Sequence, residues 1–139
     1  MNKPTDQQSF FVPLTLPGLN EILQAMQTKG MKRGRKSKRW SKYTEIKREY
    51  EGLIISAINL ANIKPVKRAY FMFTFIEKNK KRDPDNVAAG ARKFILDALV
   101  TAGVLENDGW KQVAGWTDTF MVKSGNQKSG VGVSIWADK

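Results

Sequence analysis

Four aspartates and one lysine in the second half of the chain are spaced so that they could do chemistry together. Asp83 and Asp85 lie one residue apart in the stretch RDPDN, and Lys93, Asp97 and Asp108 follow. Because the chain has neither cysteine nor histidine, only oxygen ligands could hold a metal ion. Hard cations such as Mg²⁺ and, less exclusively, Mn²⁺ prefer such ligands. Neighbouring carboxylates also repel one another, so a cluster of them is stable chiefly around a divalent cation. The residue types therefore favour a magnesium site.

The stretch between these residues predicts the helix that must position them. Apolar residues recur at helical spacing from about Pro84 to Ala102, and Gly103 is suited to end the helix. At roughly 100° per residue, Lys93 and Asp97 share a narrow polar face. The opposite, apolar face comprises Val87, Ala91, Phe94, Ile95, Ala98 and Ala102. We expect the apolar face to pack in the core and the polar face to border the candidate site.

Three carboxylates could meet at this helix. Asp83 and Asp85 lie at its N-terminus and Asp108 follows its C-terminus, so the three converge if the connection to the next strand folds back. A divalent cation held there could lower the pKa of a water molecule and hold a scissile phosphate, which is how metal-dependent nucleases attack DNA. Lys93 would face the same site and could stabilise charge that builds on the phosphate.

Each of these residues also has a purely structural interpretation. Asp-Pro opens many helices, so Asp83 could cap the helix and Asp85 could complement its dipole. Asn-Asp-Gly is a turn sequence, which would explain Asp108. Lys93 and Asp97 are four residues apart and could form an ion pair worth on the order of a few tenths of a kcal/mol. Singly, each residue is explained by structure, whereas the arrangement of the set favours a metal site.

The positive charge of the chain is concentrated in one segment. The net charge is +11, and eight of the fourteen residues from Lys29 to Lys42 are basic while none is acidic. A block of like charge repels itself until a polyanion neutralises it, so residues 29–42 are predicted to be a flexible segment that binds nucleic acid. A solvated basic loop without a partner is the alternative. The predicted DNA-binding residues are Lys32, Arg33, Arg35, Lys36, Lys38, Arg39, Lys80, Lys81 and Arg82.

The rest of the sequence predicts strands and helices that intermix. Strands are expected at residues 9–18, 66–78, 110–123 and 129–139, and helices at 19–27 and 42–62. The apolar run from Tyr70 to Ile76 indicates a strand buried on both faces in the centre of the sheet. The turn-like SGNQKSG predicts that the last two strands form a hairpin. The expected fold class is α/β: a mixed sheet with packed helices.

Length and composition set the remaining limits. With 139 residues and 41% hydrophobic content, the chain is predicted to form one domain, residues 1–139. No apolar run reaches the roughly 18 residues of a membrane span, and the first thirty residues lack the apolar core of a secretory signal. We therefore expect a cytoplasmic protein without a membrane partner.

Three spaced motifs resemble one enzyme family. RDPDN (82–86), KFILDAL (93–99) and TAGVLENDGW (101–110) are similar to the signature of the RusA-type Holliday junction resolvases, which are typically phage- or prophage-encoded endodeoxyribonucleases. LTLPG with Asn20 is a weaker echo of the first strand of that family and its following loop. This chain departs from the family in having about one extra helical turn before Lys93 and Asn107 in place of the first acid of the closing pair.

The resemblance implies specific roles. Asp83, Asp85 and Asp108 would be the metal-binding catalytic carboxylates and Lys93 the catalytic lysine, while Asp97 would support the site or the fold. It also implies a homodimer of mixed α/β fold that uses Mg²⁺ or Mn²⁺ to place paired, symmetric nicks in four-way junctions and related branched DNA. A two-fold dimer suits a substrate that is itself nearly two-fold symmetric. The location implied is the cytoplasm of a bacterial host.

Two other functions compete with the nuclease. A non-catalytic DNA- or RNA-binding protein would use the basic segment for binding and the aspartates as caps and turns. A small basic protein of a nucleoprotein particle, such as a ribosomal component, has less need of the long apolar helix at 42–62 and the acidic constellation. We therefore expect a structure-selective endonuclease.

Overall fold

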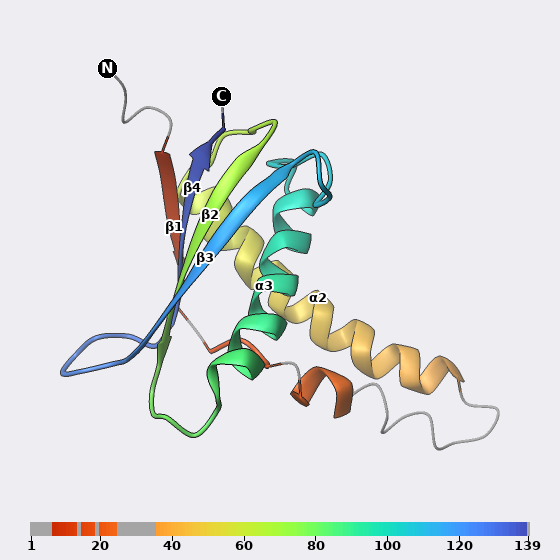
Figure 1. Cartoon of the computed structure of the whole chain (residues 1–139). Helices are drawn as coiled ribbons and strands as arrows, with labels where there is room; N and C mark the ends of the chain where they lie inside the picture. The colour runs from red at the N-terminus through yellow and green to blue at the C-terminus, as the bar shows by residue number, and fades with distance from the viewer. Residues whose placement is uncertain (1–6, 14, 19, 25–35, 139) are drawn as a thin grey trace.

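The computed structural model describes residues 7–13, 15–18, 20–24 and 36–138, with side chains in the long second helix described from residue 44 onward. A short helical segment spans residues 20–24. The elements, in chain order, are β1 Gln7–Val12, α2 Lys36–Leu60, β2 Ala69–Glu77, α3 Pro84–Thr101, β3 Val113–Val122 and β4 Gly130–Ala137. Figure 1 shows them coloured from the N-terminus to the C-terminus.

The four strands form one mixed sheet in the order β1-β4-β2-β3. The central strand β2 pairs antiparallel with β4 and parallel with β3, while β1 pairs antiparallel with β4. Helix α3 is the crossover between the two parallel strands, as parallel neighbours require. It therefore runs from the edge of the sheet where β2 ends to the edge where β3 begins. This orientation decides where the aspartates lie.

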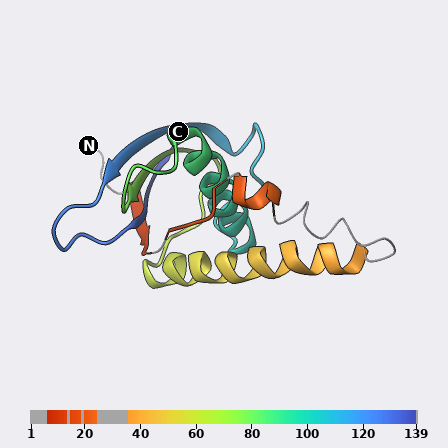
Figure 2. The ribbon, with the colours of Figure 1, turned by 90° about the horizontal axis from the view of Figure 1, so that it is seen from below.

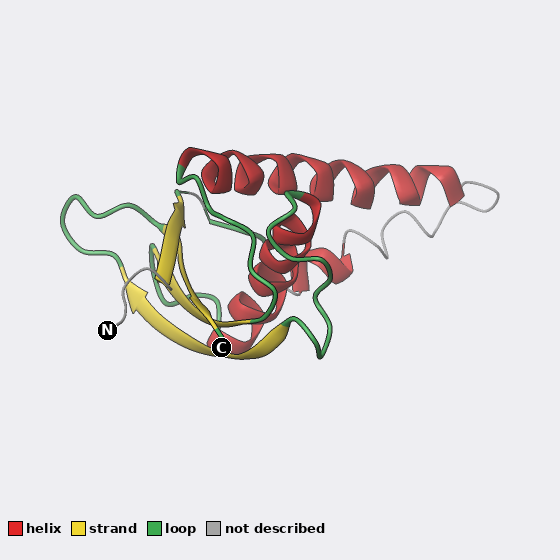
Figure 3. Ribbon diagram, turned by 90° about the horizontal axis from the view of Figure 1, so that it is seen from above, coloured by secondary structure: helices red, strands yellow, loops and turns green. Residues whose placement is uncertain are grey.

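Both helices cover the same face of the sheet, so the domain has two layers (Figure 3). The view from the opposite side in Figure 2 shows the sheet curving over α3, with α2 along its open side. Three phenylalanines of β2, Phe71, Phe73 and Phe75, point into the space between the layers and are fully buried. Phe94 and Ile95 of α3 meet them there with no exposed surface. The fold is the single α/β domain with a mixed sheet that the sequence predicts.

The burial of β2 confirms one expectation and corrects another. Its central position in the sheet is confirmed, because it lies between β4 and β3. Burial on both faces was wrong: inward residues alternate with partly exposed ones, and Tyr70 is 40% exposed. The second face of the sheet has no helix on it (Figure 3). The apolar run therefore marks a central strand with one covered face.

The predicted hairpin between the last two strands is also wrong. β3 and β4 do not pair with each other, because β2 lies between them and pairs with both. The parallel crossover through α3 places β3 at the edge of the sheet, beside β2. β4 buries Val131, Val133 and Ile135 and takes the interior place between β1 and β2. The turn near Gly125 consequently passes the end of β2 instead of joining neighbours.

The two helices begin and end close to the predicted positions. α3 ends at Thr101, and Gly103 follows with a φ of +84°, the left-handed conformation that glycine adopts most easily after a helix. α2 starts earlier than expected, at Lys36, so the last part of the basic segment belongs to its first turns. Neither helix of the described part of the chain is both long and apolar enough to cross a membrane.

Candidate functional site

Asp83 and Asp85 mark the start of α3, but neither acts as the expected cap. Asp83 has extended backbone angles and occupies the cap position, and its carbonyl oxygen accepts a hydrogen bond from the Val87 N–H at 3.1 Å. Its carboxylate makes no capping hydrogen bond. Pro84 fills the first helical position, and Asp85 lies exposed in the first turn. Within the described residues, both carboxylates are without a hydrogen-bond or ion-pair partner.

Arg82 anchors the chain immediately before these aspartates. Its guanidinium forms a two-pronged ion pair with the Glu77 carboxylate, at 3.1 Å from Nε and 2.9 Å from Nη2. It also donates to the Leu16 carbonyl at 3.0 Å and lies 3.5 Å from a carboxylate oxygen of Glu21. The side chain is only 18% exposed. Arg82 therefore ties the end of β2 and the loop after β1 to the start of α3.

The charge of Arg82 is secured by the same contacts. Burial opposes the charged form, but the hydrogen bonds and negative charges of Glu77 and Glu21 outweigh that effect and raise the pKa of Arg82. An arginine is already protonated throughout the physiological range. The ion pair is thus a permanent structural clamp, and Arg82 is committed to contacts inside the protein.

The loop after β1 packs directly against the first turn of α3. The Asn20 N–H donates to the side-chain oxygen of Asn86 at 2.7 Å, and the Gly18 N–H donates to Glu21 at 2.6 Å. Gly18 comes so close to Asn86 that a Cβ on it would lie 2.6 Å from the amide nitrogen. Only glycine fits at this position without moving Asn86. Two stretches that are far apart in the sequence, LTLPG with Asn20 and RDPDN, therefore form one site.

Asp108 lies at the other end of α3. The connection after the helix stays at the edge of the sheet where β2 and β3 begin: Val66 donates to the Val104 carbonyl at 2.9 Å and Ala69 to the Gln112 carbonyl at 2.9 Å. Asp108 is exposed, and its N–H donates to Asn107 at 2.8 Å. Its carboxylate, like those of Asp83 and Asp85, has no partner among the described residues.

A single chain therefore does not bring the three predicted metal ligands together. The connection does not fold back along α3, and an 18-residue helix is about 27 Å long. No group of three or more acidic side chains in the described residues lies close enough to hold a metal ion. Asp83 and Asp85 share one end of α3, and Asp108 occupies the opposite end.

Lys93 and Asp97 form the ion pair considered from the sequence. Lys93 Nζ lies 3.4 Å from Asp97 Oδ2, and its side chain is 60% exposed. Asp97 also receives Lys47 of α2 at 3.7 Å and is itself 18% exposed. Asp97 thus links the two helices, whereas Lys93 keeps most of its surface in solvent halfway along α3.

The predicted DNA-binding residues fall into three groups. Lys80 and Lys81 are exposed in the loop before Asp83, with the Lys81 N–H bonded to Asn79 at 2.9 Å. Arg82 is held by the acidic side chains described above. Lys32, Arg33 and Arg35 lie outside the described residues, as do the side chains of Lys36, Lys38 and Arg39, whose backbone is helical.

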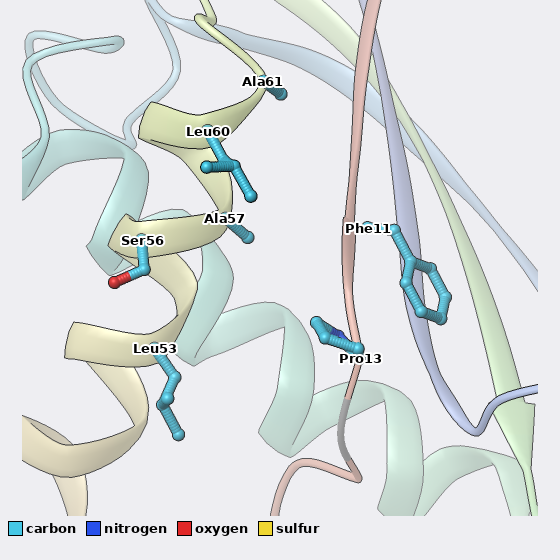
Figure 4. Close-up of a pocket in the computed structure, with 7 residues that line it drawn as sticks. All are labelled: Phe11, Pro13, Leu53, Ser56, Ala57, Leu60 and Ala61. Carbon is cyan, nitrogen blue, oxygen red and sulfur yellow. The ribbon is translucent and has the colours of Figure 1, made fainter.

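Two hollows flank the start of α3 and the long helix. A cavity of about 490 Å³ lies beside Asp83, lined by Pro84 and Val87 on one side and by Phe120 and Met121 of β3 on the other. A second, apolar pocket of about 460 Å³ lies between β1 and α2, where Phe11 faces residues such as Leu53 (Figure 4). The second pocket is lined by no charged side chain, so it offers no ligand for a metal ion.

Another charged cluster lies on the β3 side of α3 and was not predicted from the sequence. Arg92 Nη1 lies 2.5 Å from Asp118 Oδ2, and the guanidinium carbon is 4.5 Å from the centre of the Trp116 ring. Asp118 Oδ1 is buried without a hydrogen-bond partner in the described structure. The alternation of Trp116 and Asp118 along a strand was the only sequence signal for this cluster.

No protein-family model matches this chain, and no curated protein matches it in sequence.

Proposed function

We propose that this chain is a Mg²⁺- or Mn²⁺-dependent endodeoxyribonuclease of the RusA type that acts as a homodimer on branched DNA such as four-way junctions. The observation that carries the proposal is the state of Asp83 and Asp85. Both carboxylates are exposed and unpaired within the described residues, in a chain with 24 lysines and arginines. A cap or a surface ion pair would have given them partners. The implied location is the cytoplasm of a bacterial host of a phage or prophage.

The donors at the start of α3 suit a hard divalent cation. Asp83 and Asp85 would hold it through carboxylate oxygens, beside the positive end of the helix dipole, which lowers the cost of gathering negative charge. A bound cation would supply an activated water molecule and neutralise the charge of a scissile phosphate. The clamp of Arg82 on Glu77 and Glu21 would keep the two aspartates in position.

The third carboxylate requires a second copy of the chain. Because Asp108 is about 27 Å away along α3, it cannot join Asp83 and Asp85 in one protomer. In a two-fold dimer with antiparallel α3 helices, Asp108 of the partner would lie at the start of α3 and complete the site. Such a dimer has two identical sites, as paired nicks in a two-fold symmetric junction require.

The basic residues would bind the DNA around these sites. Lys80 and Lys81 are exposed one turn before the aspartates and could contact the phosphates on either side of the cut. The segment 29–42 would add sequence-independent contacts whose strength falls with salt concentration. Lys93 would stabilise the charge on the leaving group.

Mixing two inactive variants tests the proposal. Asp85→Asn and Asp108→Asn are each expected to bind a labelled four-way junction without nicking it in Mg²⁺. After the two are mixed and allowed to exchange subunits, heterodimers would contain one intact site, so roughly a quarter of all sites should nick again. Failure of the wild-type chain to nick the junction in Mg²⁺ or Mn²⁺ would reject the nuclease. Activity in the Asp108→Asn protein alone would reject the role of Asp108.

A further inference from the structure

We infer that the outer edge of β3, residues 113–122, pairs antiparallel with the same edge of a second copy and thereby builds the dimer. β3 ends the strand order, so one row of its backbone N–H and C=O groups faces away from the sheet. At ten residues it is the longest strand of the described structure. A long edge strand without protection is a template for another strand.

The side chains of β3 fit an interface better than a solvated edge. Trp116, Phe120, Met121 and Val122 are 45%, 39%, 44% and 38% exposed. The strand contains no lysine, the residue that most often guards free edges, although the chain as a whole has a net charge of +11. Its one charged residue, Asp118, is already neutralised by Arg92. Two copies could therefore approach here without the repulsion that the rest of the surface would produce.

The other free edge of the sheet is closed. β1 has six residues, ends before Pro13, and is tied to the chain after α2 by Gln8, which donates to the Lys64 carbonyl at 3.1 Å and accepts from the Lys64 N–H at 2.7 Å. Proline and a side-chain crossing both obstruct the addition of a strand. The comparison favours β3 as the pairing edge.

Strand geometry fixes the symmetry of the pair. The register with β2 places Trp116, Asp118 and Phe120 on the helix-covered face, opposite Phe71, Phe73 and Phe75. Directly opposed residues of antiparallel strands share a face, so each β3 residue must oppose one of the same face in its copy. The two-fold axis then passes through a residue near the middle of the strand, Thr117 or Asp118. Such pairing brings the exposed aromatic rings of the two copies together over one continuous sheet.

The same pairing would complete the proposed metal site, and this step rests on the proposed function. An antiparallel partner begins its β3 where this β3 ends, next to the cavity that Asp83 shares with Phe120 and Met121. Asp108 of the partner would then lie near Asp83 and Asp85. Trp110 of the partner, whose side chain is 95% exposed in the single chain, would lie at the mouth of that cavity. Exposed tryptophans of this kind commonly anchor interfaces.

Charge substitution at the two edges tests the interface without any measurement of cleavage. Thr119 of β3 and Ser9 of β1 are both exposed, so a lysine at either position should leave the monomer folded. In analytical ultracentrifugation without metal or DNA, we expect the wild-type chain to sediment as a dimer. Thr119→Lys should raise the dimer dissociation constant at least roughly tenfold, because it places two lysines close together across the two-fold axis. The matched control, Ser9→Lys, should change it less than about twofold.

Cross-linking provides a second readout, since the chain contains no cysteine. Thr117→Cys treated with a short bis-maleimide should give a covalent dimer, whereas Ser9→Cys should not. A wild-type monomer, a dimer insensitive to Thr119→Lys, or cross-linking at Ser9 instead of Thr117 would overturn the β3 interface. If the chain nicks junctions in any of these cases, the nuclease proposal survives alone. A β3 dimer that nicks nothing in Mg²⁺ or Mn²⁺ would reject the nuclease and leave the interface standing.

Discussion

Asp83 and Asp108 lie at opposite ends of α3, one where β2 ends and the other where β3 begins. Both carboxylates are without a partner in the described part of the chain. The helix between them spans 18 residues, so no rearrangement of either short loop joins them within a protomer. The predictions below separate the contribution of each residue around this helix to folding from its contribution to the proposed chemistry.

Asp83→Ala should have little effect on stability. Removing a capping carboxylate typically costs about 0.5–2 kcal/mol, but the Asp83 carboxylate makes no capping hydrogen bond. We therefore expect the free energy of unfolding, measured by urea denaturation, to change by less than about 0.5 kcal/mol. A loss of about 1 kcal/mol or more would mean that the side chain caps α3 in solution.

Gly18→Ala should disturb the start of α3. The added methyl group would lie 2.6 Å from Asn86 Nδ2 and 2.7 Å from Glu21 Oε1, so the loop must move and the bond from Asn20 to Asn86 must weaken. We expect a loss of about 1–3 kcal/mol in the free energy of unfolding. Gly52→Ala is the matched control: nothing lies within 4 Å of its added Cβ in the exposed middle of α2, and it should stabilise the protein by about 0.5–1 kcal/mol. Equal effects at both glycines would contradict the close packing of the loop.

Arg82→Gln should destabilise the protein by about 2–3 kcal/mol, because it leaves Glu77, which is 16% exposed, without its ion-pair partner. The raised pKa of Arg82 means that its contribution is fully present below its ordinary pKa and is lost only when the pH rises through the still higher folded value. Its own titration should therefore not change stability across neutral pH. Lys81→Gln, at the exposed neighbouring residue, should leave the melting temperature nearly unchanged, and a similar loss in both variants would argue against the clamp.

Lys93→Gln should reduce nicking of a four-way junction by at least roughly a hundredfold with little change in stability. Its ion pair with Asp97 is exposed and contributes at most a few tenths of a kcal/mol, on the order found for such pairs. Lys47→Gln is a matched control, because Lys47 also pairs with Asp97, at 3.7 Å, but lies on α2. If both variants lose the same activity, Lys93 acts through Asp97 and is not a catalytic residue.

Local sequence patterns predicted the elements well and their neighbours poorly. The helical repeat and Gly103 predicted α3, and the apolar run predicted the central position of β2. The hairpin between β3 and β4 failed because turn residues report only on the local chain, whereas β2 inserts between the two strands through contacts distant in sequence. A continuous apolar run likewise does not reveal that one face of the sheet lacks a helix.

The site shows the same division. RDPDN correctly indicated that Asp83 and Asp85 lie together at a helix start. The structural role of Arg82 could not be read from it, because two of its partners, Leu16 and Glu21, come from a loop more than sixty residues earlier. The separation of Asp108 from the other aspartates follows from the direction of the crossover, which the spacing alone left open.

The most direct test of the metal site compares the wild-type chain with Asp85→Asn on a labelled four-way junction. Binding is measured in Ca²⁺ and nicking in Mg²⁺ or Mn²⁺, with Glu45→Gln, at an exposed acid on α2, as the control. We predict that all three proteins bind, that the wild type and Glu45→Gln nick the junction, and that Asp85→Asn loses nicking by at least roughly a hundredfold. If the wild type binds and none of the proteins nicks, or if Asp85→Asn nicks as fast as the wild type, the aspartates do not form a catalytic metal site.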